Sequence, residues 1–452
     1  MKFLKISLFL LLFLSSFKIF AQKKSPSYIK DLQTGCRILD DNNSPGISIT
    51  WTGGCKNHFA EGYGILTWYT QEKESAKYVG FLHKGELNGK GKFTFPGTPY
   101  ALEGNFVNGN LEGKGKTTFA TGLVMNGTFS EGRFFNLDEP YLGRLENNKT
   151  QLIDSTAIYV NEGDLKPLFY YSLLPEGEVK STLVLLPSQG EIVENVINCN
   201  KKLIQLAAQN NILVVAVSIN NDRGMDDDKS ALNFLNTIFK ELIIKYNAPK
   251  DKFVLSGFSN GGMIALRYAE LAKEYSNKTA IVPCAILGVD PPVDITELYN
   301  TAKRDLSMNE GRSGLTPAKL NGLREAKSIV NFYDKIYGGS PEQYPDQYIK
   351  RSMFSRTQKD GGNARYLINI PIRLYSDPDI LWAINERNRD YFDMNAASLS
   401  AMVNLLRLQG NTKAEFIPAI GKGYRLDGTR HPHSWSIVDP QECIEWIKKV
   451  TE

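Results

Sequence analysis

The chain has 452 residues, of which 42% are hydrophobic and 23% charged, so it is long enough for two or three globular domains with cores of their own. The formal net charge of +4 falls to about +1 without Lys2, Lys5 and Lys18, which lie in the N-terminal segment described next. A balance this close to neutrality does not indicate nucleic acid or an acidic membrane as a partner.

Residues 1–21 have the pattern of a cleavable secretory signal. Lys2 and Lys5 form a positive start, a short apolar run follows, and Ala21 is a small residue suited to cleavage before Gln22. The apolar run is short for a bilayer span, which makes an uncleaved membrane anchor the weaker alternative. No cysteine lies near the cleavage point to accept a lipid. We therefore expect an exported protein, either secreted or periplasmic.

The five cysteines leave at least one thiol unpaired if the others form disulfides. Cys36 and Cys55 lie close together in the N-terminal region and are the candidates for a disulfide. The other three, Cys199, Cys284 and Cys443, fall in apolar periodic segments, where buried free thiols are expected. No C-x-x-C pair and no cluster of cysteine and histidine suggests a metal site, and we expect no cofactor.

Residues 30–137 contain an internal repeat of glycine and aromatic residues. The glycines and the last phenylalanine of one copy return 24 residues later: Gly80, Gly85, Gly89, Gly91 and Phe95 recur as Gly104, Gly109, Gly113, Gly115 and Phe119. Each copy predicts a short β-hairpin whose turns need glycine and whose aromatic face only a neighbouring copy covers. The stacked copies predict an N-terminal all-β meander.

This region resembles MORN repeats, whose motif is Y-x-G-x-F-x-x-G-x-x-x-G-x-G. Residues 78–91 match the motif at every position but one, because Leu82 stands where the motif has phenylalanine and Phe81 comes one place early. Such repeats serve as scaffolds, protein-docking surfaces and proposed lipid contacts. The resemblance therefore implies a protein or cell-envelope partner, and the alternative is a spacer that only holds the next domain.

Strands and helices alternate in the rest of the chain, which we assign to a second domain at 150–452. Strands are predicted near 168–175, 183–186, 212–217, 253–255, 280–287, 370–375 and 414–417, and helices near 193–208, 231–246 and 394–408, with a last helix capped by Asp439. This alternation predicts a mostly parallel sheet with helices on both faces. Residues 291–366 break the rhythm with helical segments and no convincing strand, which predicts a lid inserted between two strands.

One short stretch of this domain has the pattern of a catalytic serine turn. An apolar strand leads into Gly257-Phe258-Ser259-Asn260-Gly261, and helical spacing begins directly afterwards. A turn this sharp holds the serine in strained backbone angles and leaves no room for side chains two residues on either side, so glycine is needed there. The Asn260 N–H then lies beside the serine oxygen as an oxyanion donor. The alternative is a tight turn whose serine only caps the helix.

A serine nucleophile needs a base and an orienting carboxylate. His58 and His83 lie in the repeats, so the base must be His431 or His433, which both follow the last predicted strand. The strand at 370–375 ends in Ser376-Asp377-Pro378-Asp379, which places two carboxylates at the same sheet edge. We expect Asp379 to orient the histidine and keep Asp377 as its alternative; either could instead cap the next helix or hold the turn.

The order of serine, aspartate and histidine resembles the α/β-hydrolase family over residues 165–452. Carried over by position, Ser259 matches the nucleophile, Asp379 the acid and His433 the base, although Pro432 replaces the glycine that usually precedes that histidine, which keeps His431 as an alternative. The turn Pro187-Ser188-Gln189-Gly190 stands where the family has its oxyanion turn, and this makes the Gln189 N–H the second donor.

Together these features predict an exported serine hydrolase of the carboxylesterase kind, with a peptidase as its neighbour. The expected substrate is a small-molecule ester, or an ester on a polysaccharide or peptide, and an acyl-enzyme forms on Ser259 without a metal or cofactor. The alternative from another class is a catalytically inert hydrolase fold that serves as a scaffold, with the repeats docking a partner or an envelope component.

Overall fold

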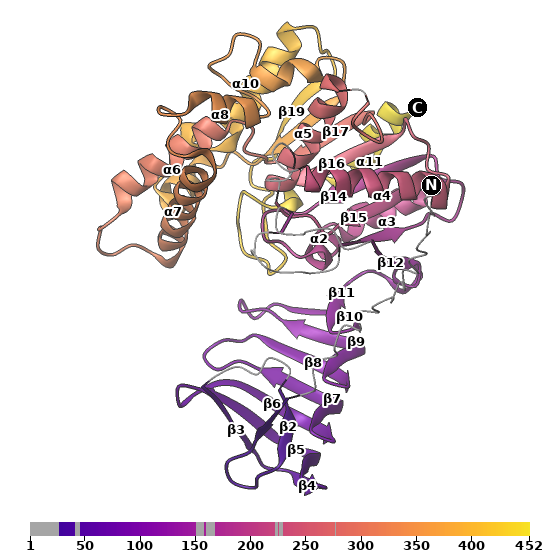
Figure 1. Ribbon diagram of the computed structural model, residues 1–452, viewed down its shortest axis with the longest axis vertical. Coiled ribbons are helices and arrows are strands. Elements are labelled where there is room, and N and C mark those ends of the chain that lie inside the picture. Colours follow the sequence, from indigo (N-terminus) through magenta and orange to yellow (C-terminus); the bar gives the residue numbers. More distant parts are fainter. Residues whose placement is uncertain are drawn as a thin grey trace, which may run out of the picture. The chain divides into compact units, whose positions relative to one another are not determined.

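The computed structural model describes residues 27–40, 46–150, 158–159, 168–221, 225, 229–275 and 277–452 (Figure 1). The predicted signal at 1–21 lies outside the described residues. The chain divides into two compact units, Met1–Gly97 with Phe106–Gly109, and Thr98–Asn105 with Asn110–Glu452. None of the helices in the described part of the chain combines the length and the apolar character needed to cross a membrane.

The first unit consists of β-strands, as the glycine and aromatic repeat predicts. Its strands are β1 (Tyr28–Lys30), β2 (Arg37–Leu39), β3 (Ile47–Trp51), β4 (Gly54–Lys56), β5 (Phe59–Thr70), β6 (Lys73–His83) and β7 (Glu86–Thr94). Strands β5, β6 and β7 pair antiparallel in sequence order. The fully buried ring of Tyr78 packs edge-on against Phe106 at 5.0 Å between ring centroids. A Cβ added at Gly91 would lie 2.2 Å from the Tyr78 hydroxyl oxygen, so this ring position requires glycine.

The one departure from the repeat motif has a structural counterpart in a β-bulge. The pairing of β6 with β7 shifts between Gly80 and Leu82, so Leu82 points inward and is 2% exposed. Phe81 points outward, is 47% exposed, and packs edge-on against Tyr63 at 5.2 Å between centroids. Leu82 therefore takes the core position that the motif gives to phenylalanine.

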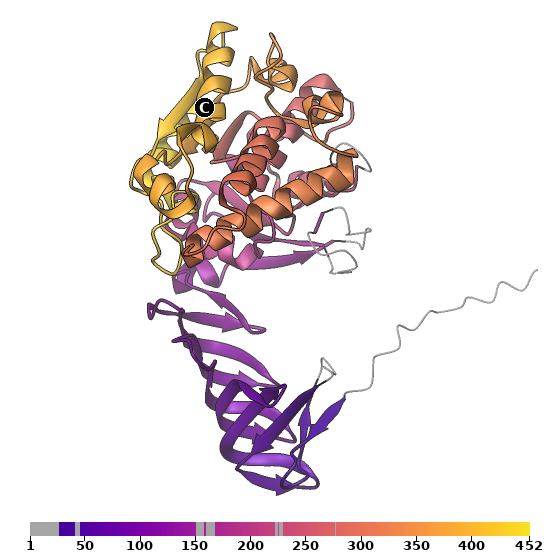
Figure 2. The same cartoon turned by 90° about the vertical axis from the view of Figure 1, so that its left-hand side faces the viewer.

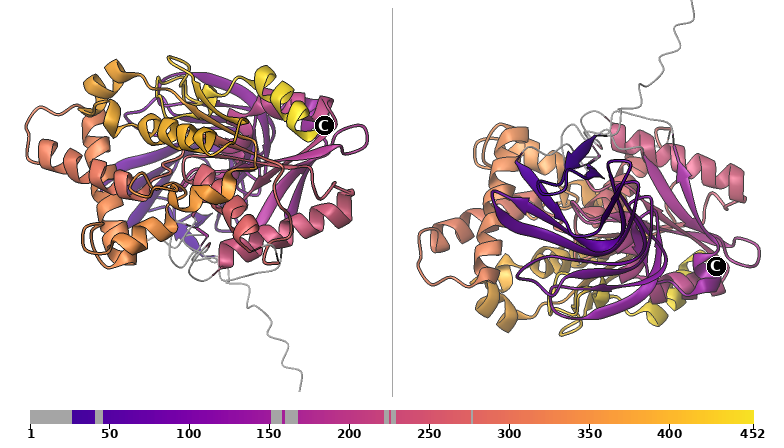
Figure 3. Two further views of the ribbon diagram at one scale, coloured as in Figure 1. Left: turned by 90° about the horizontal axis from the view of Figure 1, so that it is seen from above. Right: turned by 90° about the horizontal axis from the view of Figure 1, so that it is seen from below.

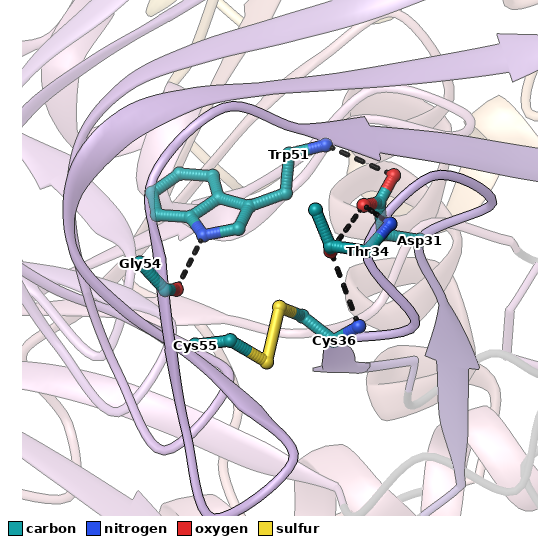
Figure 4. The surroundings of a disulfide bond; sticks show 6 residues. All are labelled: Asp31, Thr34, Cys36, Trp51, Gly54 and Cys55. Carbon is teal, nitrogen blue, oxygen red and sulfur yellow. Dashed lines mark hydrogen bonds between the residues drawn. A yellow bond between two sulfur atoms is a disulfide. The ribbon is translucent and has the colours of Figure 1, made fainter.

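The structure joins Cys36 and Cys55 by a disulfide, the pair indicated by the sequence (Figure 4). Beside it the Trp51 indole N–H donates to the Gly54 carbonyl at 2.9 Å, and the Asp31 carboxylate accepts from the Trp51 backbone N–H at 3.3 Å. The remaining cysteines, Cys199, Cys284 and Cys443, are free thiols. Burial raises the pKa of the Cys284 thiol to about 11, so it is unreactive at neutral pH.

The last repeat hairpin belongs to the larger unit. The repeat strands continue with β8 (Ala101–Val107), β9 (Asn110–Thr118), β10 (Val124–Ser130) and β11 (Arg133–Phe135), and the short helix α1 (Glu139–Leu142) follows. The Phe135 ring packs edge-on against Tyr171 of the larger unit at 5.6 Å, and the Asn198 side-chain amide donates to the Phe134 carbonyl at 2.9 Å. The division into compact units thus falls within the repeats.

The larger unit is built on an eight-stranded sheet with the order β12-β13-β15-β14-β16-β17-β18-β19. The strands are β12 (Leu145–Lys149), β13 (Phe169–Leu173), β14 (Ser181–Leu186), β15 (Ile212–Val217), β16 (Phe253–Phe258), β17 (Ala285–Val289), β18 (Ile372–Ser376) and β19 (Ala414–Pro418). All pairs from β15 onward are parallel, whereas β12 and β13 join antiparallel at one edge. This sheet confirms the predicted α/β-hydrolase fold.

Helices cover both faces of this sheet, because alternate side chains of each strand point to opposite sides (Figure 3). Along β14, Val184 and Leu186 join a core with α4 (Ser230–Tyr246), α5 (Asn260–Glu274) and α10 (Asn395–Leu408). Leu183 and Leu185 join the other core, with α2 (Val193–Cys199), α3 (Lys201–Gln209) and α11 (Pro440–Thr451).

Two predicted elements differ in their bounds. The single helix predicted at 193–208 is two helices, because the chain leaves helical geometry at Asn200, whose side-chain amide donates back to the Val196 carbonyl at 2.8 Å. The strand predicted at 280–287 begins only at Ala285, after Pro283, which has no N–H to give to a sheet ladder.

The insertion between β17 and β18 is helical, as predicted. It contains α6 (Ile295–Asn309), α7 (Pro317–Tyr337), α8 (Pro345–Arg351) and the 3-10 helix η1 (Gly362–Leu367), and residues 291–366, all described, form no strand (Figure 2). Helix α9 (Ile380–Arg387) and the 3-10 helix η2 (Tyr391–Asp393) follow β18, and the 3-10 helix η3 (Trp435–Ile437) precedes α11. Figure 1 shows α6, α7 and α8 grouped together beside the sheet.

Candidate active site

Ser259 lies in the strained turn that its glycine neighbours predict. It follows β16 directly and precedes α5, with φ 54° and ψ −119°, a conformation that costs a non-glycine residue energy and persists only where the surroundings enforce it. A Cβ at Gly257 would lie 2.1 Å from the Gly261 carbonyl carbon, and one at Gly261 would lie 2.2 Å from the Leu186 carbonyl oxygen. Both glycines are therefore needed for the backbone to turn at this place.

His433 is oriented by Asp290, a carboxylate that follows the strand next to the serine strand. His433 Nδ1 lies 2.6 Å from Asp290 Oδ2, and the Ser376 hydroxyl donates to Asp290 Oδ1 at 2.6 Å. Because a carboxylate accepts, Nδ1 carries the proton and Nε2 is left as a base. The imidazole also packs on the Phe258 ring at 4.5 Å between centroids, next to Ser259.

The structure does not bring Asp379 or Asp377 to either histidine, which corrects the expected acid. Asp379 Oδ1 accepts from the Trp382 N–H as the cap of α9, and its Oδ2 accepts from Arg430 at 2.7 Å. Asp377 is 1% exposed, accepts from two backbone N–H groups of the loop after β19, and pairs with Arg430 at 2.8 Å. Both carboxylates therefore have the cap and turn roles that were the alternatives, and both hold the loop that carries the histidines.

His431 has no free nitrogen with which to act as a base. Its Nδ1 lies 3.0 Å from the His433 carbonyl oxygen, so Nδ1 donates, and its Nε2 accepts from the Arg387 guanidinium at 3.1 Å. Burial, together with the nearby charges of Arg425 and Arg387, lowers the pKa of His431 to about 3. The imidazole is thus neutral at physiological pH and holds the backbone of His433.

The two predicted oxyanion donors lie at the same site with their backbone N–H groups available. In the described chain neither the Asn260 N–H nor the Gln189 N–H forms a hydrogen bond. Asn260 is the first residue of α5, so the positive end of the helix dipole adds to its N–H. Two such donors beside a serine hydroxyl have the chemistry that could stabilise a tetrahedral oxyanion.

Glu191 connects the oxyanion turn with the histidine loop and has no counterpart among the sequence predictions. Its carboxylate accepts from the Ser188 N–H at 2.9 Å and from the Trp435 indole N–H at 3.2 Å, and it also accepts from the Asn195 side-chain amide. Burial raises the pKa of Glu191. The Trp435 ring in turn packs on Phe258 at 5.6 Å between centroids, so the Glu191 carboxylate connects the turn that carries Gln189 with the loop that carries His433.

A single cavity of about 1090 Å³ contains these groups. Ser259, Asp290 and His433 line it together with Gln189 and Asn260. Helices α6 and α7 supply an apolar wall of Leu298, Ala302, Ile329, Phe332 and Ile336, so the predicted lid insertion does border the site. Within the described residues, no group of three or more potential metal ligands is found.

The family model for the MORN repeat matches residues 52–72, 78–97 and 103–124. These segments are MORN repeats. The matched residues contain β4, β5, β7 and β9, parts of β6 and β8, and the first residue of β10, so the chain joins MORN repeats to a domain with the α/β-hydrolase fold. No curated protein matches the sequence of the chain.

Among solved structures, the chain is similar to esterases and peptidases of the α/β-hydrolase fold. A puromycin-hydrolyzing peptidase of Mycobacterium tuberculosis matches at 13% identity and a TM-score of 0.41, over 81% of this chain and 49% of the peptidase, so the chain spans about half the length of that protein. Esterase B from Lactobacillus rhamnosis matches at 12% identity and 0.42, over 70% and 89%. An acylaminoacyl peptidase of Pyrococcus horikoshii matches at 14% and 0.41, over 95% and 70%.

The acid missed by sequence reasoning did have a signal in the chain. Asp290 follows the buried strand β17 immediately, and Pro291-Pro292 then ends the strand before the insertion begins. Because β17 pairs in parallel with the serine strand β16, a carboxylate at its carboxyl end lies nearer the serine than one after β18. Asp290 lies just before the predicted insertion at 291–366 and beyond the predicted strand at 280–287, so only the carboxylates after the strand at 370–375 were considered as the acid.

Proposed function

We propose that the protein is a serine hydrolase that cleaves an ester, or an amide, through an acyl-enzyme on Ser259. The observation that carries this proposal is the strained Ser259 turn in one cavity with a His433–Asp290 pair at 2.6 Å. An inert scaffold has no need to keep a serine at φ 54° beside an oriented imidazole. The intact set of groups therefore favours catalysis over the scaffold hypothesis.

The mechanism follows from the orientation of the imidazole. His433 Nε2 accepts the proton of the Ser259 hydroxyl as its oxygen attacks the carbonyl carbon of the substrate, and Asp290 stabilises the imidazolium that forms. The carbonyl oxygen becomes an oxyanion held by the Asn260 and Gln189 N–H groups. Collapse breaks the bond to the leaving group, which takes the proton from Nε2. Water, deprotonated by the same nitrogen, then attacks the acyl carbon. The bond to the Ser259 oxygen breaks, this oxygen takes the proton back from Nε2, and the acid is released.

A fluorophosphonate probe tests this proposal directly, because it reacts with serine hydroxyls that an adjacent base has activated. We expect one adduct per chain, located at Ser259 by peptide mass spectrometry, and no adduct in the Ser259→Ala variant. Circular dichroism of the variant serves as the folding control. A folded wild-type chain without labelling, or with an adduct on another residue, would refute the proposal.

We further propose that the protein is exported, with residues 1–21 removed. The disulfide between Cys36 and Cys55 supports this proposal, because stable disulfides are typical of oxidising compartments.

We expect Glu191→Ala to lower kcat by about 100-fold with little change in KM, because the oxyanion turn and the Trp435 side of the histidine loop would lose their common acceptor. Glu191→Gln should stay within a few-fold of wild type, since an amide oxygen still accepts from Ser188 and Trp435 once the Asn195 amide turns over. Steady-state kinetics on a 4-nitrophenyl ester measure both. A rise in KM alone, or equal losses in the two variants, would exclude a positioning role.

A further inference from the structure

One MORN repeat borders the cavity that contains Ser259. Phe119 lines this cavity and belongs to the matched repeat at residues 103–124. It lies in the larger structural unit together with the whole hydrolase sheet. The repeat thus contributes a side chain to the wall of the candidate active site.

The turn that carries Phe119 is fixed to a hydrolase loop on the same cavity wall. The Phe119 backbone N–H donates to the Leu123 carbonyl at 2.8 Å, which closes the turn, and the Thr121 hydroxyl donates to the Asp427 carbonyl at 2.8 Å. Residues 424–427 line the cavity too, and the chain continues from them to the two histidines. The Leu123 side chain also lies against Gly428, where an added Cβ would be 3.5 Å away.

The hairpin after this turn is anchored in the hydrolase core. Phe135 and Leu137 are 3% and 5% exposed and belong to the hydrophobic core of the larger unit. The Arg133 guanidinium donates to the Tyr171 hydroxyl at 2.9 Å and pairs with Glu194 at 3.4 Å. This packing gives the repeat turn a defined place at the cavity, so Phe119 is available as a preorganised contact.

We propose that Phe119 is a specificity-determining residue, and that the repeat at 103–124 completes a substrate site selective for esters with a bulky, aromatic or extended apolar group. This inference rests on the proposed serine-hydrolase function and adds the substrate class. A small ester occupies only the part of the cavity near Ser259. A larger one reaches the Phe119 ring and buries apolar surface against it, which strengthens the binding of that substrate alone.

The repeat itself supplies a matched control variant. Phe95 occupies the position in the preceding copy that Phe119 occupies in this one, 24 residues later, and the Phe95 ring packs on Phe93 at 5.2 Å instead of lining the cavity. Phe95→Ala therefore removes the same side chain from the same place in the motif without touching the proposed substrate site. Phe119→Trp keeps an aromatic surface at the cavity.

The test compares two pairs of esters on the purified full-length chain. One pair has the same 4-nitrophenol leaving group and differs in the acyl part, acetate against 4-phenylbutanoate; the other has the same butyryl part and differs in the alcohol, phenol against 4-benzylphenol. In at least one pair we expect Phe119→Ala to lower kcat/KM for the bulky ester by about 10- to 100-fold and to leave that for the small ester within about 2-fold. Phe95→Ala should change neither, and Phe119→Trp should retain most of the preference.

The outcomes separate this inference from the proposed function. Equal losses on bulky and small esters, an unchanged ratio in both pairs, or the same effect from Phe95→Ala would each overturn the role of Phe119, while fluorophosphonate labelling of Ser259 would still hold. Absence of labelling in the wild type would instead overturn the hydrolase proposal. If no ester is turned over, the measured quantity is instead the protection of Ser259 from fluorophosphonate labelling by 4-phenylbutanoate. Equal protection of the wild type and of Phe119→Ala would contradict the inference.

Discussion

We expect His433→Ala to lower kcat for an ester substrate by about 10⁶-fold. Serine and histidine act as a unit in catalysis, so removing either one loses nearly the whole rate enhancement of the pair. In the proposed mechanism the Ser259 hydroxyl would then have no acceptor for its proton, because His433 Nε2 is the atom that takes it. Labelling by the fluorophosphonate should fall in parallel. Initial rates measured at high enzyme concentration, with thermal unfolding to confirm the fold, give the number.

His431→Ala is the control for this loss. His431 keeps both ring nitrogens occupied and holds the His433 carbonyl at 3.0 Å, so its removal should displace the base rather than delete it. We expect a decrease of about 10- to 100-fold. If His431→Ala abolished turnover while His433→Ala retained it, the base would have to be reassigned to His431.

Asp290→Asn should lower kcat by about 10⁴-fold while leaving the protein folded. An amide N–H₂ in place of the Oδ2 acceptor favours the imidazole tautomer with its proton on Nε2, which can no longer accept the serine proton. The loss of the carboxylate charge also removes the stabilisation of the imidazolium. Turnover of the same ester by the wild type and the variant measures this effect, and KM should change little.

Asp379→Asn tests whether Asp379 rather than Asp290 is the acid. The amide oxygen of the variant can still cap α9 at the Trp382 N–H, and the residue touches neither histidine, so kcat should change by less than about 10-fold. The protein should lose some stability, because the pairing with Arg430 weakens. If Asp379→Asn lowered kcat by about 10⁴-fold and Asp290→Asn left kcat nearly unchanged, the assignment of Asp290 as the acid would be wrong.

The serine turn shows how much a local pattern can determine. Gly257, Ser259 and Gly261 belong to one strand-to-helix junction, and the clashes that demand glycine arise between backbone atoms close in sequence or in the adjacent strand β14. The strands and helices of the large domain were likewise set by local periodicity. Glycines and aromatic residues of the repeats also predicted their own structure, because ring and glycine meet within one hairpin, as Tyr78 and Gly91 do.

Partners that meet across the sheet could not be assigned in the same way. Whether Asp290, Asp377 or Asp379 faces His433 depends on the path of the loop after β19 and on Arg430, which takes up two of the three carboxylates. His431 and His433 are two residues apart and have the same local chemistry. Only His431 packs on Trp382 and accepts from Arg387, which gives it a structural role.

The sequence by itself therefore determined the repeat class, the hydrolase fold, the serine turn and the two candidate bases, since each depends on residues near one another in the chain. Only the tertiary structure decided that the Asp290 carboxylate lies beside His433, that Glu191 joins the turn at 187–190 to the histidine loop, and that Phe119 of a repeat lines the same cavity. The two hydrogen bonds, from His433 to Asp290 and from Trp435 to Glu191, join residues 143 and 244 positions apart, and Phe119 lies far from Ser259 in the sequence, so tertiary packing and not local propensity brings these residues together.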